Sequence, residues 1–166
     1  MSRPSPIVAL YPGSFDPITR GHEDIVRRGL RVADRLVVAV ARVATQSKKA
    51  LFTVDERVAL IQDVFRGDDR IEVMAFEGLL VDFARARGAH LVIRGLRAVS
   101  DFEYELQMAQ MNQELWPGIE TIFLVPEVQN SFISSSLVRE VAALGGDVSS
   151  FVSPSVLEGL HLKLER

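Results

Sequence analysis

Short, almost wholly apolar runs alternate with longer amphipathic stretches along the chain. The apolar runs predict five strands of a parallel sheet, and the stretches between them have the helical spacing of apolar residues that predicts crossover helices. The predicted strands are Ile7–Leu10, Arg35–Ala41, Ile71–Phe76, Leu91–Ile93 and Thr121–Val125. The predicted helices cover about 19–33, 53–65, 79–87, 100–115, 133–144 and 156–164.

Local sequence marks several of the helix ends. Thr53-Val54-Asp55-Glu56 and Ser100-Asp101-Phe102-Glu103 both have the pattern of a capping box, in which a side chain and the backbone satisfy each other at a helix start. Gly88 suits a C-terminal cap, and Ser153-Pro154 places a proline at a helix start. We expect helices to begin or end at these positions.

Strands and helices that alternate five times predict one α/β domain over residues 1–166, with residues 1–6 as a flexible lead-in. Right-handed crossovers place helices on both faces of such a sheet. The predicted fold is therefore a Rossmann-like, doubly wound five-stranded parallel sheet with strand order 3-2-1-4-5. Ligands bind where the order reverses, which is between strands 1 and 4.

Composition excludes several classes of protein. The 166 residues are 48% hydrophobic and 25% charged, which is ordinary for a globular protein. The net charge of −3 provides no general attraction to nucleic acid or to an anionic membrane. No apolar run approaches the ~20 residues that span a bilayer. The chain has no cysteine, so disulfides and cysteine-bound metals are excluded and a cytoplasmic enzyme or binding protein is expected.

The loop after the first strand is the most unusual stretch: Tyr11-Pro12-Gly13-Ser14-Phe15-Asp16-Pro17-Ile18-Thr19-Arg20-Gly21-His22. Gly13 lets a ligand approach the backbone closely. Gly21 leaves the start of the next helix without a side chain. Ser14 and the Phe15 N–H can hold one phosphate, and His22, in the first helical turn, can donate to another. A lone histidine would also fit a half-buried structural role, but its combination with the glycines favours a phosphate pocket.

Three further segments follow strands or open a helix at the same sheet edge. Lys48 can act as a positive charge on a phosphate, or it can be a solvated loop residue. Arg94 and Arg97 surround a glycine and can bind anionic oxygens through paired N–H donors, an interpretation that we favour over surface salt bridges. The serines at 134–136 can cradle phosphates at a helix start or only cap the helix.

Together these motifs resemble those of the bacterial phosphopantetheine adenylyltransferases. Gly-Ser-Phe-Asp-Pro-Ile-Thr-x-Gly-His at 13–22 is similar to the histidine motif of the nucleotidyltransferase superfamily, and Ser-Phe-Ile-Ser-Ser-Ser at 131–136, with Arg139, resembles its second nucleotide motif. Ile-Arg-Gly-Leu-Arg-Ala-Val-x-Asp-Phe-Glu-Tyr-Glu at 93–105 resembles a segment particular to this family. The likeness extends from Ile7 to the last helix.

The resemblance implies transfer of the adenylyl group of ATP to 4′-phosphopantetheine, giving dephospho-coenzyme A and pyrophosphate, with Mg²⁺ held mainly by phosphates. It also implies a homohexamer, feedback inhibition by coenzyme A, and no nucleic-acid or membrane partner. His22, Lys48 and Arg94 would be catalytic. Phosphopantetheine would be bound by Ser14, Lys48, Leu80 and Arg94, and ATP by Ser14, Phe15, His22, Gly95, Leu96, Arg97, Glu105, Asn130, Ser131, Phe132, Ile133, Ser134, Ser135 and Ser136.

The residues leave alternatives open. The chain can be another small nucleotidyltransferase, acting on nicotinamide mononucleotide or glycerol phosphate, or a non-catalytic module that binds ATP. A structural assembly protein fits least, because it gives no reason for basic and glycine residues to gather at one sheet edge. For an enzyme, the attacking phosphate already carries close to two negative charges. It needs no general base, so positioning and electrostatics are expected to drive a direct in-line displacement.

Overall fold

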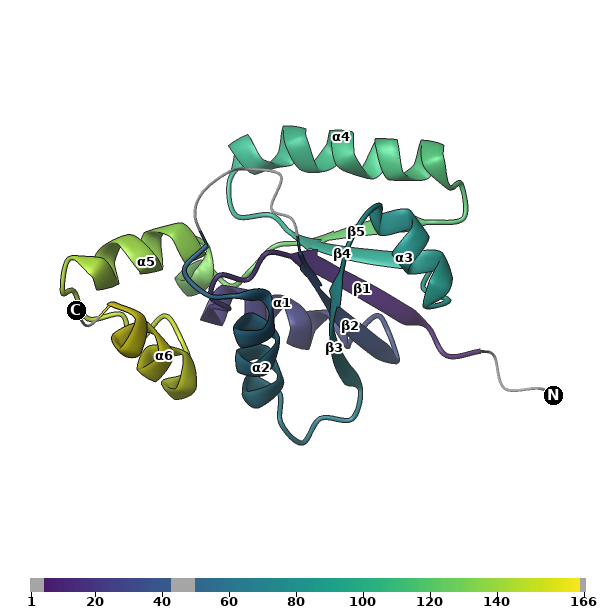
Figure 1. The fold of residues 1–166 in the computed structure, drawn as a ribbon. Helices are drawn as coiled ribbons and strands as arrows, with labels where there is room; N and C mark the ends of the chain where they lie inside the picture. The colour runs from purple at the N-terminus through teal and green to yellow at the C-terminus, as the bar shows by residue number, and fades with distance from the viewer. Residues whose placement is uncertain (1–4, 43–49, 165–166) are drawn as a thin grey trace.

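The computed structural model describes residues 5–42 and 50–164, apart from the side chains of residues 99 and 100. Its centre is a five-stranded parallel sheet with strand order 3-2-1-4-5, which confirms the predicted fold (Figure 1). The strands are β1 (Val8–Gly13), β2 (Arg35–Ala41), β3 (Ile71–Phe76), β4 (Leu91–Gly95) and β5 (Glu120–Leu124). The helices are α1 (Arg20–Gly29), α2 (Val54–Val64), α3 (Leu80–Ala86), α4 (Val99–Leu115), α5 (Ser135–Ala143) and α6 (Pro154–Leu164), with a short 3-10 helix, η1 (Val128–Asn130).

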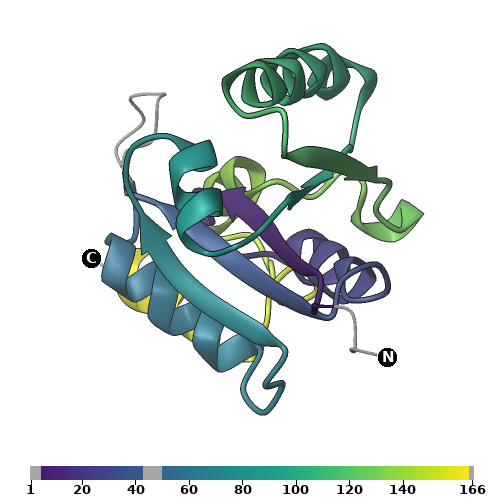
Figure 2. The ribbon, with the colours of Figure 1, turned by 90° about the vertical axis from the view of Figure 1, so that its right-hand side faces the viewer.

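The sheet separates two hydrophobic clusters because successive residues of a strand point to opposite faces. Ala9 and Tyr11 of β1 belong to the larger cluster, which α1, α2, α5 and α6 cover. Leu10, between them, belongs to the smaller cluster with α3 and with Trp116, the residue after α4. Helices therefore lie on both faces, as expected for a doubly wound sheet. Figure 2 shows the same arrangement from a second direction, with α4 at the outside of the molecule.

One predicted helix start is wrong and another is confirmed. α4 begins at Val99 with Ala98 as its N-cap and no side-chain cap hydrogen bond, so the capping box predicted to start at Ser100 is not the cap. The helix starts earlier because the chain already turns into it directly after β4. At α2, Thr53 and Glu56 form the predicted capping box, with bonds of 2.8 and 3.2 Å.

Two strands are longer than predicted. β1 continues to Gly13 and β4 continues to Gly95, because their parallel ladders with β2 and β5 extend that far. Arg94 therefore lies within the sheet, in register with Phe123, and not in a loop after it. A strand position holds the Arg94 backbone more firmly than a loop would.

Helix α4 packs less deeply than its length suggests. Of its described side chains, Glu105 and Asn112 are buried, and both are polar. Several large apolar side chains of this helix are instead exposed: Phe102, Tyr104, Leu106, Met108, Met111 and Leu115. Exposed apolar side chains gathered on one element are typical of an interaction surface.

Within residues 5–42 and 50–164, no helix combines the length and the apolar character that crossing a bilayer requires. Residues 1–4 of the expected lead-in lie outside the described residues, and Ser5 and Pro6 are exposed ahead of β1.

Candidate active site

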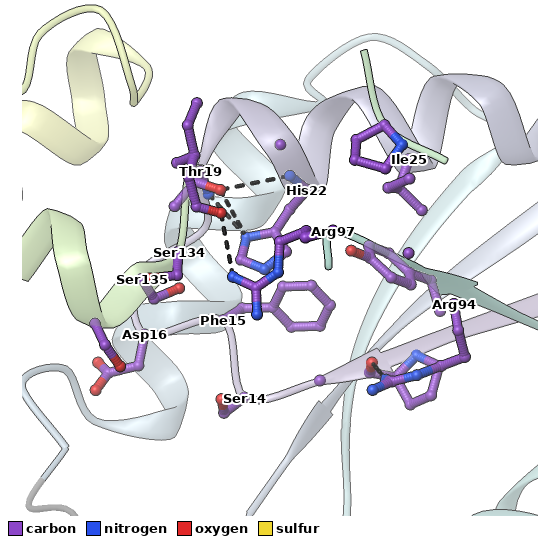
Figure 3. A pocket seen from close by; sticks show the side chains of 18 of the residues that line it. Ser14, Phe15, Asp16, Thr19, His22, Ile25, Arg94, Arg97, Ser134 and Ser135 are labelled. Atoms are coloured by element: carbon purple, nitrogen blue, oxygen red, sulfur yellow. Dashed lines mark hydrogen bonds between the residues drawn. The ribbon is translucent and has the colours of Figure 1, made fainter. Parts of the chain in front are cut away.

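The loop after β1, the end of β4 and the start of α5 meet around a cavity of about 670 Å³ (Figure 3). This is the carboxyl edge of the sheet, where the strand order reverses between β1 and β4. His22 and Arg94 both line the cavity. The predicted site residues that line it are Ser14, Phe15, His22, Arg94, Gly95, Arg97, Glu105, Asn130, Ile133, Ser134, Ser135 and Ser136.

Some predicted site residues are placed elsewhere. Leu80 begins α3 and packs against the smaller hydrophobic cluster, away from the cavity lining. Leu96, Ser131 and Phe132 are also absent from the lining, and Phe132 is largely exposed. Lys48 lies outside the described residues. The binding roles of these five residues stay predictions, as do those of the predicted residues that line the cavity.

Side chains of two helices donate hydrogen bonds to backbone carbonyls of the loop after β1. Arg57 of α2 donates from Nη1 to the Ser14 carbonyl at 2.7 Å. The Ser135 hydroxyl of α5 donates to the Pro17 carbonyl at 2.7 Å. Two different helices thus hold the loop in place.

Asp16 links this loop to two more segments. Its carboxylate accepts the backbone N–H groups of Leu51 and Phe52, each at 2.9 Å. Arg139 of α5 donates to the Asp16 carbonyl and lies 3.4 Å from its carboxylate. Because Asp16 makes these contacts within the protein, its role is to hold the conformation of the loop.

Phe15 has a φ of 48°, in the left-handed region that non-glycine residues rarely adopt. Its ring is buried and packs edge-on against Tyr11 and His22, with ring centroids 5.2 and 5.0 Å apart. A Cβ on Gly13 would lie 3.0 Å from this ring, which explains the glycine. The loop backbone is therefore held in an unusual conformation by packing.

The orientation of the His22 ring is set by the first turn of α1. Nδ1 accepts the backbone N–H of Thr19, the N-cap residue, at 3.0 Å, and the two residues form a capping box that was not predicted. A backbone N–H can only donate, so the neutral ring carries its proton on Nε2. Among the described residues, Nε2 has no hydrogen-bond partner, so this N–H is available to a ligand in the cavity.

Burial, together with the positive charges of Arg97 and Arg94, lowers the pKa of His22 to about 3. The ring is therefore neutral at physiological pH. It can stabilise developing negative charge by donating a hydrogen bond from Nε2, and it needs no change in its own charge to do so.

This pKa predicts that the ring signal of His22 will not titrate near pH 6.5 in an NMR series. An unfolded imidazole takes up a proton near pH 6.5, whereas the folded ring stays neutral down to about pH 3. The unfolded state then binds more protons within this interval, so the free energy of unfolding should fall as pH is lowered through it. Urea unfolding at pH 7.5 and 5 should show a larger loss for the wild type than for His22→Gln. Equal losses, with a ring that titrates normally, would contradict the neutral assignment.

Arg94 is held by α4 and β1. Its Nε and Nη2 donate to the two carboxylate oxygens of Glu105 at 2.7 and 2.5 Å, and Nη1 donates to the Pro12 carbonyl at 2.5 Å. Burial acts to lower the pKa of Arg94, but the hydrogen bonds and charge of Glu105 outweigh it and raise this pKa. A guanidinium has five N–H donors and these contacts use three, so two remain for an anionic ligand.

The start of α5 contributes Ser134, Ser135 and Ser136 to the cavity lining. Ser134 is its N-cap and accepts the N–H of Leu137 at 3.1 Å, which confirms the capping role. Arg97 donates to the Ile133 carbonyl at 3.2 Å and lies 3.4 Å from the Asp101 carboxylate. Capping by one serine leaves the N–H groups of the helix start facing a cavity lined by arginines, an arrangement that suits phosphate.

The sequence did not predict several of the residues that line the cavity, and Arg57 is the most informative of them. It is buried on α2 and lies 43 positions from Ser14, the residue that it contacts. One local signal was available. Arg57 stands four residues before buried Ile61, on the same face of the helix. A charged residue at such a position indicates a partner inside the protein.

Comparisons with known proteins first define the class of protein to which the chain belongs. A family model described as Cytidylyltransferase-like matches residues 10–141, so the chain is a nucleotidyltransferase-superfamily domain. A crystal structure from Vibrio parahaemolyticus, of a protein assigned as a nicotinate-nucleotide adenylyltransferase, has the same fold. Its TM-score is 0.69 at 17% sequence identity, over 96% of each chain.

Curated relatives then define the family within that class. The phosphopantetheine adenylyltransferase of Alkalilimnicola ehrlichii is 58% identical over 93% of this chain and 88% of its own. Those of Methylobacillus flagellatus and Geotalea daltonii are 56% and 52% identical, over 96% of this chain and at least 98% of theirs. The chain belongs to the phosphopantetheine adenylyltransferase family.

Proposed function

We propose that the protein transfers the adenylyl group of ATP to 4′-phosphopantetheine, releasing pyrophosphate and forming dephospho-coenzyme A in coenzyme A biosynthesis. The observation that carries this proposal is that an Nε2–H donor on His22 and a guanidinium with unused donors on Arg94 line one cavity. The names of relatives at 52–58% identity supply the substrates.

The reaction brings two anions together, which is its main electrostatic difficulty. An oxygen of the phosphopantetheine phosphate attacks the α-phosphorus of ATP, and the bond to the pyrophosphate oxygen breaks on the opposite side. No proton has to be removed from the nucleophile. The two remaining N–H donors of Arg94, together with Lys48, would hold the attacking phosphate in line.

The chain's own donors would stabilise the charge that develops on the α-phosphoryl group. The Nε2–H of His22 is fixed by the Thr19 contact and so requires little reorganisation. The N–H groups at the start of α5, with Arg97, would take the outer phosphates of ATP, where the helix dipole favours negative charge. The leaving pyrophosphate would thus depart toward a positive surface.

Mg²⁺ is proposed to accompany the triphosphate. In the described part of the chain, no three His, Asp or Glu side chains gather in a way that could hold a metal ion, so phosphate oxygens and water would be its ligands. When bound, Mg²⁺ neutralises part of the phosphate charge. The residue roles given above do not depend on its position.

A direct test is incubation with ATP, Mg²⁺ and 4′-phosphopantetheine, followed by detection of dephospho-coenzyme A by mass and of pyrophosphate. Nicotinamide mononucleotide and glycerol phosphate serve as alternative acceptors. Product from one of these alone would identify a different nucleotidyltransferase. ATP binding without pyrophosphate from any acceptor would identify a non-catalytic module.

The proposal extends to a cytoplasmic homohexamer that coenzyme A inhibits. The exposed apolar side chains of α4 support assembly, because a partner subunit would bury them. Light scattering during size-exclusion chromatography measures the mass of the assembly. Inhibition by coenzyme A, measured against varied phosphopantetheine, should be competitive if both ligands use one cavity.

Lys48→Ala should raise KM for phosphopantetheine about tenfold, because one charged hydrogen bond to the acceptor phosphate is lost. KM for ATP should change much less. Steady-state kinetics with each substrate varied in turn measure both constants. Lys163→Ala is the control, because the Lys163 ammonium pairs with Glu56 of α2 at 2.7 Å. A larger effect on ATP than on phosphopantetheine would contradict the predicted role of Lys48.

A further inference from the structure

Arg57 is a buried arginine that the reaction described above does not use. The residue is 5% exposed, and no carboxylate among the described residues forms a salt bridge with it. Its guanidinium donates instead to backbone carbonyls, from Nε to Thr53 at 3.3 Å and from Nη1 to Ser14 at 2.7 Å. Burying a charge without an ionic partner is unfavourable. Its place in the cavity lining therefore points to a role in the site.

The contact with Ser14 fixes the direction of the next backbone N–H. The Ser14–Phe15 peptide is trans, since the cis peptide of the described chain is Asp16–Pro17. In a trans peptide the C=O and N–H bonds point in opposite directions. Because the Ser14 carbonyl points to Arg57, the Phe15 N–H points away from α2. Over residues 5–42 and 50–164 this N–H has no acceptor, although Ser14 and Phe15 both line the cavity.

The backbone at Phe15 needs support from its surroundings. Its φ of 48° is unfavourable for a side chain other than glycine, and such conformations persist where several contacts determine them. One contact is the buried ring against His22, and another is the Arg57 bond to the preceding carbonyl. Rotation of the Ser14–Phe15 peptide would exchange the two groups and present a carbonyl oxygen, instead of an N–H, to an incoming phosphate.

We infer that Arg57 is a positioning residue, which keeps the Ser14–Phe15 peptide oriented so that the Phe15 N–H can donate to a phosphate of ATP. This inference rests on the proposed function, because it specifies how one donor of that site is kept in place. Arg57 acts through the peptide, and its charge also adds to the positive potential of the cavity.

Kinetics provide the first test. Arg57→Met keeps most of the side-chain volume but removes the donors, and kcat should fall about thirtyfold because a phosphate donor is no longer held in place. KM for phosphopantetheine should stay within about twofold, since the acceptor contacts remain. Arg57→Lys, whose ammonium group retains N–H donors and the charge, should recover most of kcat. Arg87→Met is the matched control, because Arg87 pairs with Glu72 away from the cavity.

The second readout reports on the peptide itself. In protein labelled with 15N-phenylalanine, the Phe15 amide is one of nine phenylalanine signals in an NMR spectrum. In the wild type, ATP should shift this signal strongly, as expected when an N–H gains a phosphate acceptor. In Arg57→Met the shift should be mostly lost, while Phe83 on α3 remains unaffected in both proteins.

The two readouts separate this inference from the proposed function. A folded Arg57→Met with unchanged kcat and a normal ATP-induced shift of Phe15 would overturn the positioning role. If Arg57→Met does not fold, Arg57→Gln, whose shorter side chain also loses the Ser14 contact, is judged by the same two signals. A wild type that forms no product would refute the proposed function alone, because the response of Phe15 to ATP still tests the inference.

Discussion

Replacing His22 with alanine is expected to lower kcat about a thousandfold, because the Nε2–H that we propose as a donor to the α-phosphoryl group is lost. KM for ATP should change by less than about threefold, since the donors at the start of α5 and on Arg97 remain. Steady-state kinetics with ATP varied at saturating phosphopantetheine measure both constants. The Thr19 capping contact is lost as well, so the variant should also be less stable by about 1 kcal/mol.

His90 provides a control for this experiment. Its Nδ1 lies 3.0 Å from the Gly118 carbonyl, away from the cavity lining, and His90→Ala should leave kcat unchanged. His22→Gln retains an N–H donor and should keep more activity than His22→Ala. A rise in KM for ATP with an unchanged kcat would make His22 a binding residue and not a stabiliser of the transition state.

Arg94→Ala should lower kcat/KM for phosphopantetheine about a thousandfold, through two effects that act in the same direction. The two unused guanidinium donors, which we propose bind the attacking phosphate, are lost. The Glu105 carboxylate, which is 11% exposed and paired with Arg94, is left as an uncompensated charge that repels the incoming anion. Kinetics with phosphopantetheine varied measure the effect.

A double variant separates the two effects. Arg94→Ala combined with Glu105→Gln removes the repulsion but does not restore the lost contact with the phosphate. Its kcat/KM for phosphopantetheine should therefore be about tenfold higher than that of Arg94→Ala alone. Arg87 provides a control away from the cavity: its Nη2 donates to both carboxylate oxygens of Glu72 at 2.7 Å, and Arg87→Ala should leave kcat/KM unchanged. A double variant no better than Arg94→Ala would show that Glu105 does not repel the acceptor.

The sheet was predictable because its signal is local and repeated. β2 and β3 have the predicted bounds, because the polar segments on either side of an apolar run indicate where a buried strand begins and ends. The start of α4 was mispredicted because Ser100 and Glu103 have the right spacing for a capping box, yet the turn after β4 had already begun the helix at Val99. Tertiary structure decided that boundary, and spacing alone could not reveal it.

The site was predictable only in part for a similar reason. His22 and Arg94 stand at strand and helix ends whose position in a doubly wound sheet is known in advance. The Arg57–Ser14 contact joins residues 43 positions apart, and the Arg139–Asp16 contact joins residues 123 apart. The helical position of Arg57 indicates a buried partner but does not say which one, so only the folded chain shows that these two arginines hold the loop.

Helix α4 has one further consequence. Glu105 on this helix holds the guanidinium that would receive the acceptor phosphate, while the same helix exposes apolar side chains suited to another subunit. In the assembly proposed above, a neighbour that favours one position of α4 would also favour one state of Arg94. By thermodynamic reciprocity, acceptor binding would strengthen or weaken the subunit contact by the same factor. If the proposed assembly forms, specific activity should therefore depend on enzyme concentration, and adding the acceptor should shift the dilution at which the assembly dissociates.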